Sequence, residues 1–427
     1  MSEQARGVKN INVPKTVKQV GNLADEFYED LRRAPSEGRM VAWAGGYPST
    51  FPILRAMDVA YLFEDVYAAT AAARHMEADL QHASANLGYL PEMCSYSRTT
   101  IGMAHMPMEK RREGNPYYNI PNPDMMTYID PGCSMICNWS DAGRRMFKVP
   151  MFGVAMPYLR RWEDEPDVVA ETTKQLNEMV VFLEDTCKKK FDWDRLRANM
   201  VHVKEASALR MEAQDIAGRA PKSPATFFDW AATVGALSYG LGTEKSVQVM
   251  RAIRDEMKDR ADQGITALPN EQVRAFWMGH MCWPYMGWWG NTLADLGVNI
   301  IAAQYTHQSF MDRPHLIDPE DPMTGLAYNS IMCVGLGLEI IAQRTIEAMR
   351  AYHIDALICH NTQTCRVFAA PQREIVEMIQ RELGCPVTYI DGDVADPNFF
   401  TSEQARTRLQ VLKEMVLSQR KRSSVTH

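Results

Sequence analysis

Short apolar runs alternate with longer helix-like segments in two separate stretches of this 427-residue chain. Such alternation is typical of parallel βαβ units, because two parallel strands need a long crossover between them. The apolar runs predict strands at residues 40–44, 125–129, 149–156, 273–278, 298–303, 356–359 and 386–390. We therefore expect an α/β fold with two Rossmann- or flavodoxin-like parallel-sheet domains.

Helical periodicity dominates the remainder of the chain. The segment 16–33 has its apolar residues on one helical face, and the region between the two α/β stretches is helical apart from breaks at prolines and at 235–242. Residues 49–76 also have a mainly helical pattern, and a helix at 403–420 precedes a frayed basic tail. The predicted units are an N-terminal helical element at 1–38, a first α/β domain at 39–163, a helical insert at 164–264 and a second α/β domain at 265–427.

Composition narrows the class of protein. The net charge of −7 disfavours a nucleic-acid partner, because such binding rests on cationic side chains that displace counterions. The chain has no apolar run of about 18 residues and no signal-peptide pattern at its start, so we expect a cytoplasmic protein with no membrane contact. Nine dispersed cysteines favour free or metal-bound thiols over a disulfide framework.

Four polar loops follow predicted strands or open predicted helices, the places where open α/β sheets bind ligands. Three of them contain cysteines, so the candidate ligands are Cys94, Cys133 or Cys137, and Cys359 or Cys365. The absence of paired CxxC motifs disfavours a zinc ribbon. These thiols either share a metal site or pack as small apolar side chains. The loops span residues 45–48, 92–98, 131–137 and 360–368.

The cysteine-bearing segments contain three motifs in a set order. The first is EMCSYSR at 92–98, the second is Gly132-Cys133 with Trp139 downstream, and the third is NTQTC at 361–365. Together they resemble the three cysteine motifs of the 2-hydroxyacyl-CoA dehydratase and benzoyl-CoA reductase superfamily. The stretch DVADPNFF at 393–400 looks closest to the larger cluster-bearing subunit of ATP-dependent benzoyl-CoA reductases.

The resemblance implies a [4Fe-4S] cluster held by Cys94, Cys133 and Cys365, with one iron free of protein thiolate. Such an iron has an exchangeable position for a substrate oxygen, as catalytic zinc sites do. Cys133 is preferred to Cys137 because its spacing to the residues downstream matches the family. A double-cubane relative implies an alternative, an [8Fe-9S] cluster to which Cys137 or Cys359 contributes.

The function implied by the resemblance is that of an iron–sulfur subunit of a low-potential acyl-CoA reductase of the benzoyl-CoA reductase type. Such a subunit transfers single electrons to a CoA thioester. The alternatives are a 2-hydroxyacyl-CoA dehydratase subunit acting through a ketyl radical, a non-catalytic electron-relay subunit and a double-cubane reductase. The implied partners are a homologous cluster-bearing subunit, an ATP-hydrolysing iron–sulfur activator and an acyl-CoA substrate.

The same resemblance places Gly46, Tyr47 and Ser49 near the substrate thioester. Dehydratases of the family usually have a proline followed two residues later by glutamate in this loop. The corresponding position here is Thr50, after Pro48, so that acid is missing.

Further candidates come from the histidines and from one charged segment. His307 and His360 lie in candidate loops and are weak candidates for a catalytic proton donor. His280, with the aromatic run at 283–289, predicts either an acyl pocket or an aromatic core. The basic stretch 109–112 predicts either a contact with CoA phosphates or a solvated charged loop.

Overall fold

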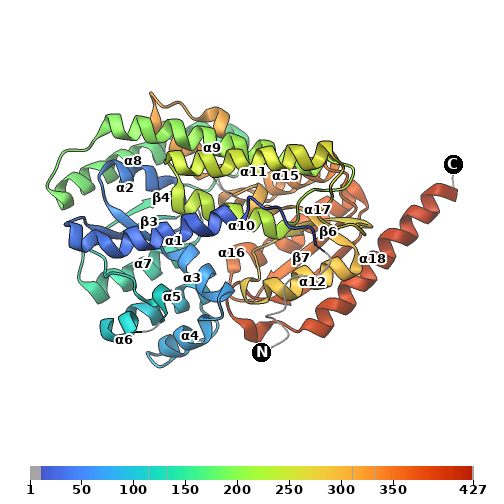
Figure 1. The fold of residues 1–427 in the computed structure, drawn as a ribbon, viewed down its shortest axis with the longest axis horizontal. Helices are drawn as coiled ribbons and strands as arrows, with labels where there is room; N and C mark the ends of the chain where they lie inside the picture. The colour runs from blue at the N-terminus through green and yellow to red at the C-terminus, as the bar shows by residue number, and fades with distance from the viewer. Residues whose placement is uncertain (1–10, 114, 131, 310, 332, 426–427) are drawn as a thin grey trace.

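The computed structural model of this chain describes residues 11–425 apart from 114, 131, 310 and 332 (Figure 1). Its described strands form two parallel sheets of four strands each, in the orders β2-β1-β3-β4 and β6-β5-β7-β8. The expected α/β fold with two parallel sheets is confirmed. The strands are β1 Val41–Gly45, β2 Ala60–Phe63, β3 Met125–Asp130, β4 Met151–Ala155, β5 Val273–Met278, β6 Val298–Ala303, β7 Ala356–Thr362 and β8 Val387–Gly392.

Strand β2 corrects the prediction that residues 49–76 are mainly helical. It lies between the short helix α2 (Phe51–Ala56) and α3 (Glu64–Ala73), and it pairs with β1 along four residues. All four residues of β2 are buried, so the strand has no alternation of polar and apolar side chains. A short, wholly apolar run cannot be distinguished from buried helix by periodicity alone.

The helices of the middle region pack against three different partners. Helix α9 (Trp193–Arg219) packs along α11 (Glu244–Asp262), as Figure 1 shows along the upper side of the molecule. Helix α10 (Phe227–Gly240) packs against α1 (Lys18–Arg33). Helix α8 (Glu165–Cys187) lies instead against β4.

Helix α10 moves the expected break at 235–242 to its end, because the helix stops at Gly240 and α11 begins at Glu244. The helix begins at a capping box of Thr226 and Asp229 and continues through Gly235 to Gly240. A Cβ at Gly240 would lie 2.9 Å from Leu23 of α1, so the glycine permits close helix packing. Tertiary contact with α1 therefore outweighs the weak helix propensity of glycine.

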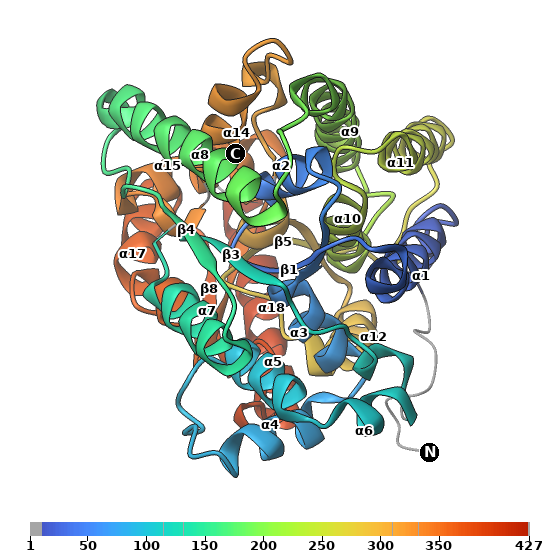
Figure 2. The same cartoon turned by 90° about the vertical axis from the view of Figure 1, so that its left-hand side faces the viewer.

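Four further helices lie below the first sheet in both views (Figures 1 and 2), and α7 among them packs on β3. The expected loop at 109–112 is helical. Arg111 is only 2% exposed, and its guanidinium donates hydrogen bonds to the carbonyl of Ile120 (3.0 Å) and to Oδ1 of Asn122 (2.9 Å). Arg111 therefore holds neighbouring chain segments together and does not face solvent. The four helices are α4 Glu77–Ala85, α5 Ser95–His105, α6 Met108–Glu113 and α7 Ser134–Phe147.

The remaining helices belong to the second half of the chain. The expected frayed tail is wrong, because α18 continues to Val425 and projects away from the molecule (Figure 1). Arg420 anchors it through Nη2, which donates to both carboxylate oxygens of Asp355 at 2.6 Å. These helices are α12 Met286–Leu296, α13 Gln304–His307, α14 Pro322–Ser330, α15 Leu338–Ala351, α16 Arg366–Ala369, α17 Gln372–Leu383 and α18 Ser402–Val425.

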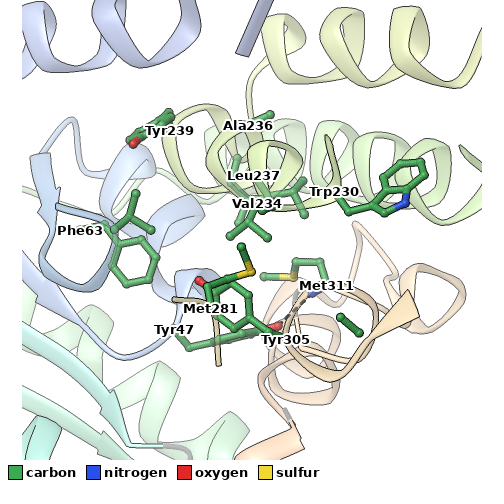
Figure 3. Packing of buried hydrophobic residues seen from close by; sticks show 14 of the residues in the cluster. Tyr47, Phe63, Trp230, Val234, Ala236, Leu237, Tyr239, Met281, Tyr305 and Met311 are labelled. Carbon is green, nitrogen blue, oxygen red and sulfur yellow. Dashed lines mark hydrogen bonds between the residues drawn. The ribbon is translucent and has the colours of Figure 1, made fainter. Parts of the chain in front are cut away.

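One hydrophobic core joins the two sheets. Figure 3 shows Tyr47 and Phe63, from the ends of β1 and β2, near Met281 and Tyr305, from the ends of β5 and β6, with Val234 of α10 above them. The carboxyl ends of both sheets therefore face each other. Among the described helices, none is long and apolar enough to cross a bilayer.

Candidate functional site

A cavity of about 80 Å³ lies where the carboxyl ends of the two sheets meet. Residues that follow seven of the eight described strands line it, so both halves of the chain build its wall. Cys94, Cys133 and Cys365 all line this cavity. The other lining residues are mostly apolar and include Phe63, Tyr96, Ile136, Trp139, Tyr305, Val367 and Phe368.

Each of the three cysteines is the N-cap residue of a helix. Cys94 precedes α5, Cys133 precedes α7 and Cys365 precedes α16. The partial positive charge of a helix N-terminus favours negative charge on a nearby sulfur. Asp130 helps to place one of them, because its Oδ1 accepts the backbone N–H of Gly132 at 2.8 Å and that of Cys133.

Burial opposes ionisation of these thiols. It raises the pKa of Cys94 to about 12 and also raises the pKa values of Cys133 and Cys365. Cys133 raises the pKa values of Cys94 and Cys365, and Cys94 also raises that of Cys365, because the thiols lie close enough for thiolate charges to repel. Backbone N–H groups of the first helical turns lower each pKa in part. A bound metal cation reverses this balance by stabilising the thiolates.

Asp393 connects two of the cysteine-bearing loops. This carboxylate is fully buried and accepts hydrogen bonds from the hydroxyl of Ser95 and from both the N–H (2.8 Å) and the hydroxyl (2.7 Å) of Thr364. Ser95 follows Cys94 directly and Thr364 precedes Cys365. Asp393 thereby fixes the relative positions of Cys94 and Cys365, two candidate ligands from opposite halves of the chain.

A buried ion pair supports the same junction. Arg98 of α5 donates to Asp396 at 2.7 Å, and both side chains are at least 95% buried. The Ser95 N–H also donates to the hydroxyl of Thr364 at 3.1 Å. These contacts hold helix α5 against the segments that follow β7 and β8.

The three thiols at the cavity are the donor type that iron–sulfur clusters use. Within the described part of the chain, no three His, Cys, Asp or Glu side chains converge on one metal position. A cubane cluster distributes its irons over separate corners, so its thiolates need not converge. Three thiols around one cavity, each beside helix N–H groups that can hydrogen-bond to sulfur, match that donor set.

The other two cysteine candidates lie elsewhere. Cys137 is one turn further along α7 and accepts a hydrogen bond from the hydroxyl of Tyr128 at 3.3 Å. Cys359 is completely buried in β7, close to Cys385. Neither is among the residues that line the cavity.

The loop after β1 reaches the cavity through one residue. Gly46 lines it with φ +92°, and a Cβ there would lie 1.9 Å from the carbonyl oxygen of Ile129, so only glycine fits. Tyr47 turns into the core, where its hydroxyl accepts the N–H of Met311 at 2.9 Å (Figure 3). Ser49 is also buried, and its hydroxyl accepts a hydrogen bond from Ser330.

The three histidine candidates are placed differently. His280 lines the cavity and is in contact with Tyr305, at a ring-centroid distance of 4.2 Å. Of the set formed by His280 and the run 283–289, only His280 lines this cavity, and the buried Trp289 packs among aromatic rings of the core. His360 is fully buried, His307 is half-buried beside Trp230 of α10, and neither residue lines the cavity.

Asp65 is a lining residue that the sequence patterns did not reveal. It follows β2, its Oδ2 accepts the N–H of Gly46 at 2.9 Å, and burial raises its pKa to about 7. A carboxyl group with such a pKa can hold or release a proton near neutral pH. The sequence patterns did not predict β2. Had that strand been predicted, Asp65 would have been recognised as a residue at the carboxyl end of a strand.

Comparison with known proteins identifies the family of this chain. The family model for the 2-hydroxyglutaryl-CoA dehydratase D-component matches residues 49–416. An (R)-2-hydroxyisocaproyl-CoA dehydratase alpha subunit from Clostridioides difficile is 25% identical over 94% of this chain and 96% of its own length. An (R)-phenyllactyl-CoA dehydratase alpha subunit from Clostridium sporogenes is 23% identical over 96% and 98%. A subunit of benzoyl-CoA reductase from Thauera aromatica is 25% identical over 79% and 80%. The chain therefore belongs to the 2-hydroxyglutaryl-CoA dehydratase D-component family.

Proposed function

We propose that this protein is an iron–sulfur enzyme subunit that acts on the thioester of an acyl-CoA. The proposal rests on one observation: Cys94, Cys133 and Cys365, from three distant segments, line a single cavity. These three thiolates would hold a [4Fe-4S] cluster. When bound, such a cluster supplies single electrons and an iron position open to a substrate oxygen.

The chain's own residues would prepare the cavity for that chemistry. Aromatic and aliphatic side chains line most of it, and they exclude water from a reactive thioester. Asp65 would hold a proton at its carboxyl group at or below neutral pH, within the same cavity. Gly46 lets the loop after β1 pass close to β3 at the cavity wall, since any side chain there would collide with the backbone of Ile129.

We favour removal of water from a 2-hydroxyacyl-CoA as the reaction. Both dehydratase subunits named above align with at least 94% of this chain, whereas the reductase subunit aligns with 79%. Loss of a hydroxyl group is assisted by a proton donor, and Asp65 supplies a carboxyl group that the loop Pro48-Ser49-Thr50 lacks. This preference replaces benzoyl-CoA reduction, which the sequence motifs favoured.

Reduction of an aromatic acyl-CoA is the second candidate. Its support is the cavity wall, to which Phe63, Tyr96, Trp139, Tyr305 and Phe368 contribute aromatic rings. Such rings stack favourably against a planar substrate. Both reactions require the partners inferred from the motifs, namely a second cluster-bearing subunit and an ATP-hydrolysing iron–sulfur activator.

Metal analysis tests the cluster. Anaerobically purified wild-type protein should contain about four irons per chain, as one [4Fe-4S] cluster requires, and Cys94→Ser, Cys133→Ser or Cys365→Ser should each reduce that content sharply. Cys137→Ser and Cys359→Ala are the matched controls and should leave it unchanged. A wild type without iron would overturn the proposal. About eight irons per chain, with a lower iron content in Cys137→Ser or Cys359→Ala, would favour the double cubane.

An activity assay then separates the two reactions. The reconstituted system should dehydrate 2-hydroxyisocaproyl-CoA or phenyllactyl-CoA and leave benzoyl-CoA unchanged. Consumption of benzoyl-CoA without dehydration would reverse the preference. A full cluster with neither activity would indicate an electron-relay subunit.

A further inference from the structure

His280 is the histidine that the fold brings to the cavity. It follows β5, is 8% exposed and lines the cavity. Its ring contacts Tyr305 at 4.2 Å and lies edge-on to Tyr96 and Phe368, each at 5.3 Å between ring centroids. Tyr96 and Phe368 belong to helices α5 and α16, whose N-cap residues are Cys94 and Cys365.

Hydrogen bonding fixes which ring nitrogen of His280 carries the proton. The backbone N–H of Met281 donates to Nδ1 of His280 at 2.8 Å, so Nδ1 must be unprotonated. A neutral imidazole has one N–H, and it is therefore at Nε2. Among the described residues no partner of Nε2 is present, although the side chain is more than nine-tenths buried.

His360 reinforces this arrangement from behind. Its Nδ1 lies 2.7 Å from the carbonyl oxygen of His280, and because a carbonyl only accepts, that nitrogen must donate. The His280 backbone is thus held by β7, and its ring by the next peptide N–H. Preorganisation of this kind makes a single donor effective, because no reorientation is needed when a ligand arrives.

The ring also remains neutral over the ordinary pH range. Burial, with a further contribution from His360, lowers the pKa of His280 to about 3. A neutral Nε2–H donates a hydrogen bond without transferring its proton, and its nitrogen has no lone pair for a metal. His280 is therefore suited neither to general acid catalysis nor to ligation of an open iron.

We propose that His280 donates a hydrogen bond from Nε2 to the carbonyl oxygen of the acyl-CoA thioester and so positions it in the cavity. This inference rests on the proposed function, because it takes the thioester as the ligand. It adds a recognition residue that is distinct from the three thiols and from Asp65. The only ligand atom that it requires is a hydrogen-bond acceptor.

Two variants separate the nitrogen atoms. His280→Gln places an amide N–H near the position of Nε2, whereas His280→Asn retains a polar group only near Nδ1. The probes are 2-hydroxyisocaproyl-CoA and benzoyl-CoA, each labelled with ¹³C at the thioester carbonyl, and the readouts are the dissociation constant and the infrared C=O stretch of the bound probe. Iron content is measured in every sample.

We expect wild type and His280→Gln to bind a probe with a lowered C=O stretching frequency. His280→Asn should lose that shift and bind about 10- to 100-fold more weakly, the effect of one lost hydrogen bond in a buried site, with iron content unchanged. An unaltered shift and affinity in His280→Asn would overturn the role of His280 alone. Loss of iron in that variant would also overturn it, by making His280 a cluster ligand.

A separate measurement does not depend on the substrate. The ¹⁵N chemical shifts of labelled histidine should show His280 protonated at Nε2 and not at Nδ1 between pH 6 and 8. The opposite tautomer would overturn the inference even if acyl-CoA binds. Failure of the wild type to bind either probe, with the expected tautomer present, would overturn the proposed function and with it the assignment of the ligand.

Discussion

Replacement of Asp393 by asparagine should loosen the junction that holds two of the three candidate ligands. Oδ2 of this buried carboxylate accepts both the N–H and the hydroxyl of Thr364. Oδ1 accepts the hydroxyl of Ser95 and the N–H groups of Ala395 (3.2 Å) and Asp396 (3.1 Å). Every group around the carboxylate is therefore a donor.

An asparagine amide must place its NH₂ where one of these oxygens now lies. In either orientation of the amide, at least one buried backbone N–H faces another donor. The acceptor is also neutral, so the remaining hydrogen bonds are weaker than those to a carboxylate. Each unmade buried bond costs about 1–3 kcal/mol, so we expect the free energy of unfolding to fall by about 3 kcal/mol. Because Cys94 and Cys365 adjoin this network, iron content should fall as well.

Urea denaturation of the cluster-free chain and iron analysis of the anaerobically purified protein measure the two effects. Asp391→Asn is the matched control. Asp391 lies on β8 and pairs with Arg408 at 3.2 Å, but its side chain is 40% exposed. Exposed ion pairs contribute about 0–1 kcal/mol. If Asp393→Asn were no less stable than this control and retained full iron, the positioning role of Asp393 would be refuted.

Two further predictions concern stability. Burial raises the pKa of Asp65 from 3.8 to about 7, so the folded state binds a proton that the unfolded state has lost, and stability falls as the pH rises from about 4 to 7. Asp65→Asn should therefore raise the free energy of unfolding by up to about 4 kcal/mol at pH 8 and change it little at pH 4. Equal effects at both pH values in urea denaturation would contradict this assignment. Gly102→Ala should cost about 3 kcal/mol, because its Cβ would lie 1.8 Å from the carbonyl oxygen of Leu80. Gly21→Ala, with open space around it, should instead stabilise the protein by about 0.5–1 kcal/mol in thermal and urea unfolding, and a similar loss in both variants would refute the steric argument.

Local patterns were sufficient for most of the architecture. Seven of the eight described strands were predicted within a few residues, because each is an apolar run between helical segments. The exceptions are cases in which tertiary contacts override a local preference. Strand β2 is too short and too uniformly buried to show a period, and α10 continues through two glycines because α1 packs against them.

The candidate site was predictable only in part. The order and spacing of the cysteine motifs selected Cys94, Cys133 and Cys365, and the structure places these three at one cavity and Cys137 and Cys359 outside it. That choice came from a resemblance to a family, since the residues alone left each pair of cysteines open. The assignment of the cluster itself stays a prediction until iron is measured.

The α/β class, the two sheets and the loops that carry thiols follow from the sequence alone, because periodicity and turn residues act over short distances. Only the tertiary structure decided which side chains share a site. Ser95 and Thr364 are 269 positions apart, yet they meet at the carboxylate of Asp393. His280 owes its available N–H to one backbone bond and its place to aromatic rings from other elements. Such relations depend on how buried donors and acceptors find partners across the fold, and no local pattern records them.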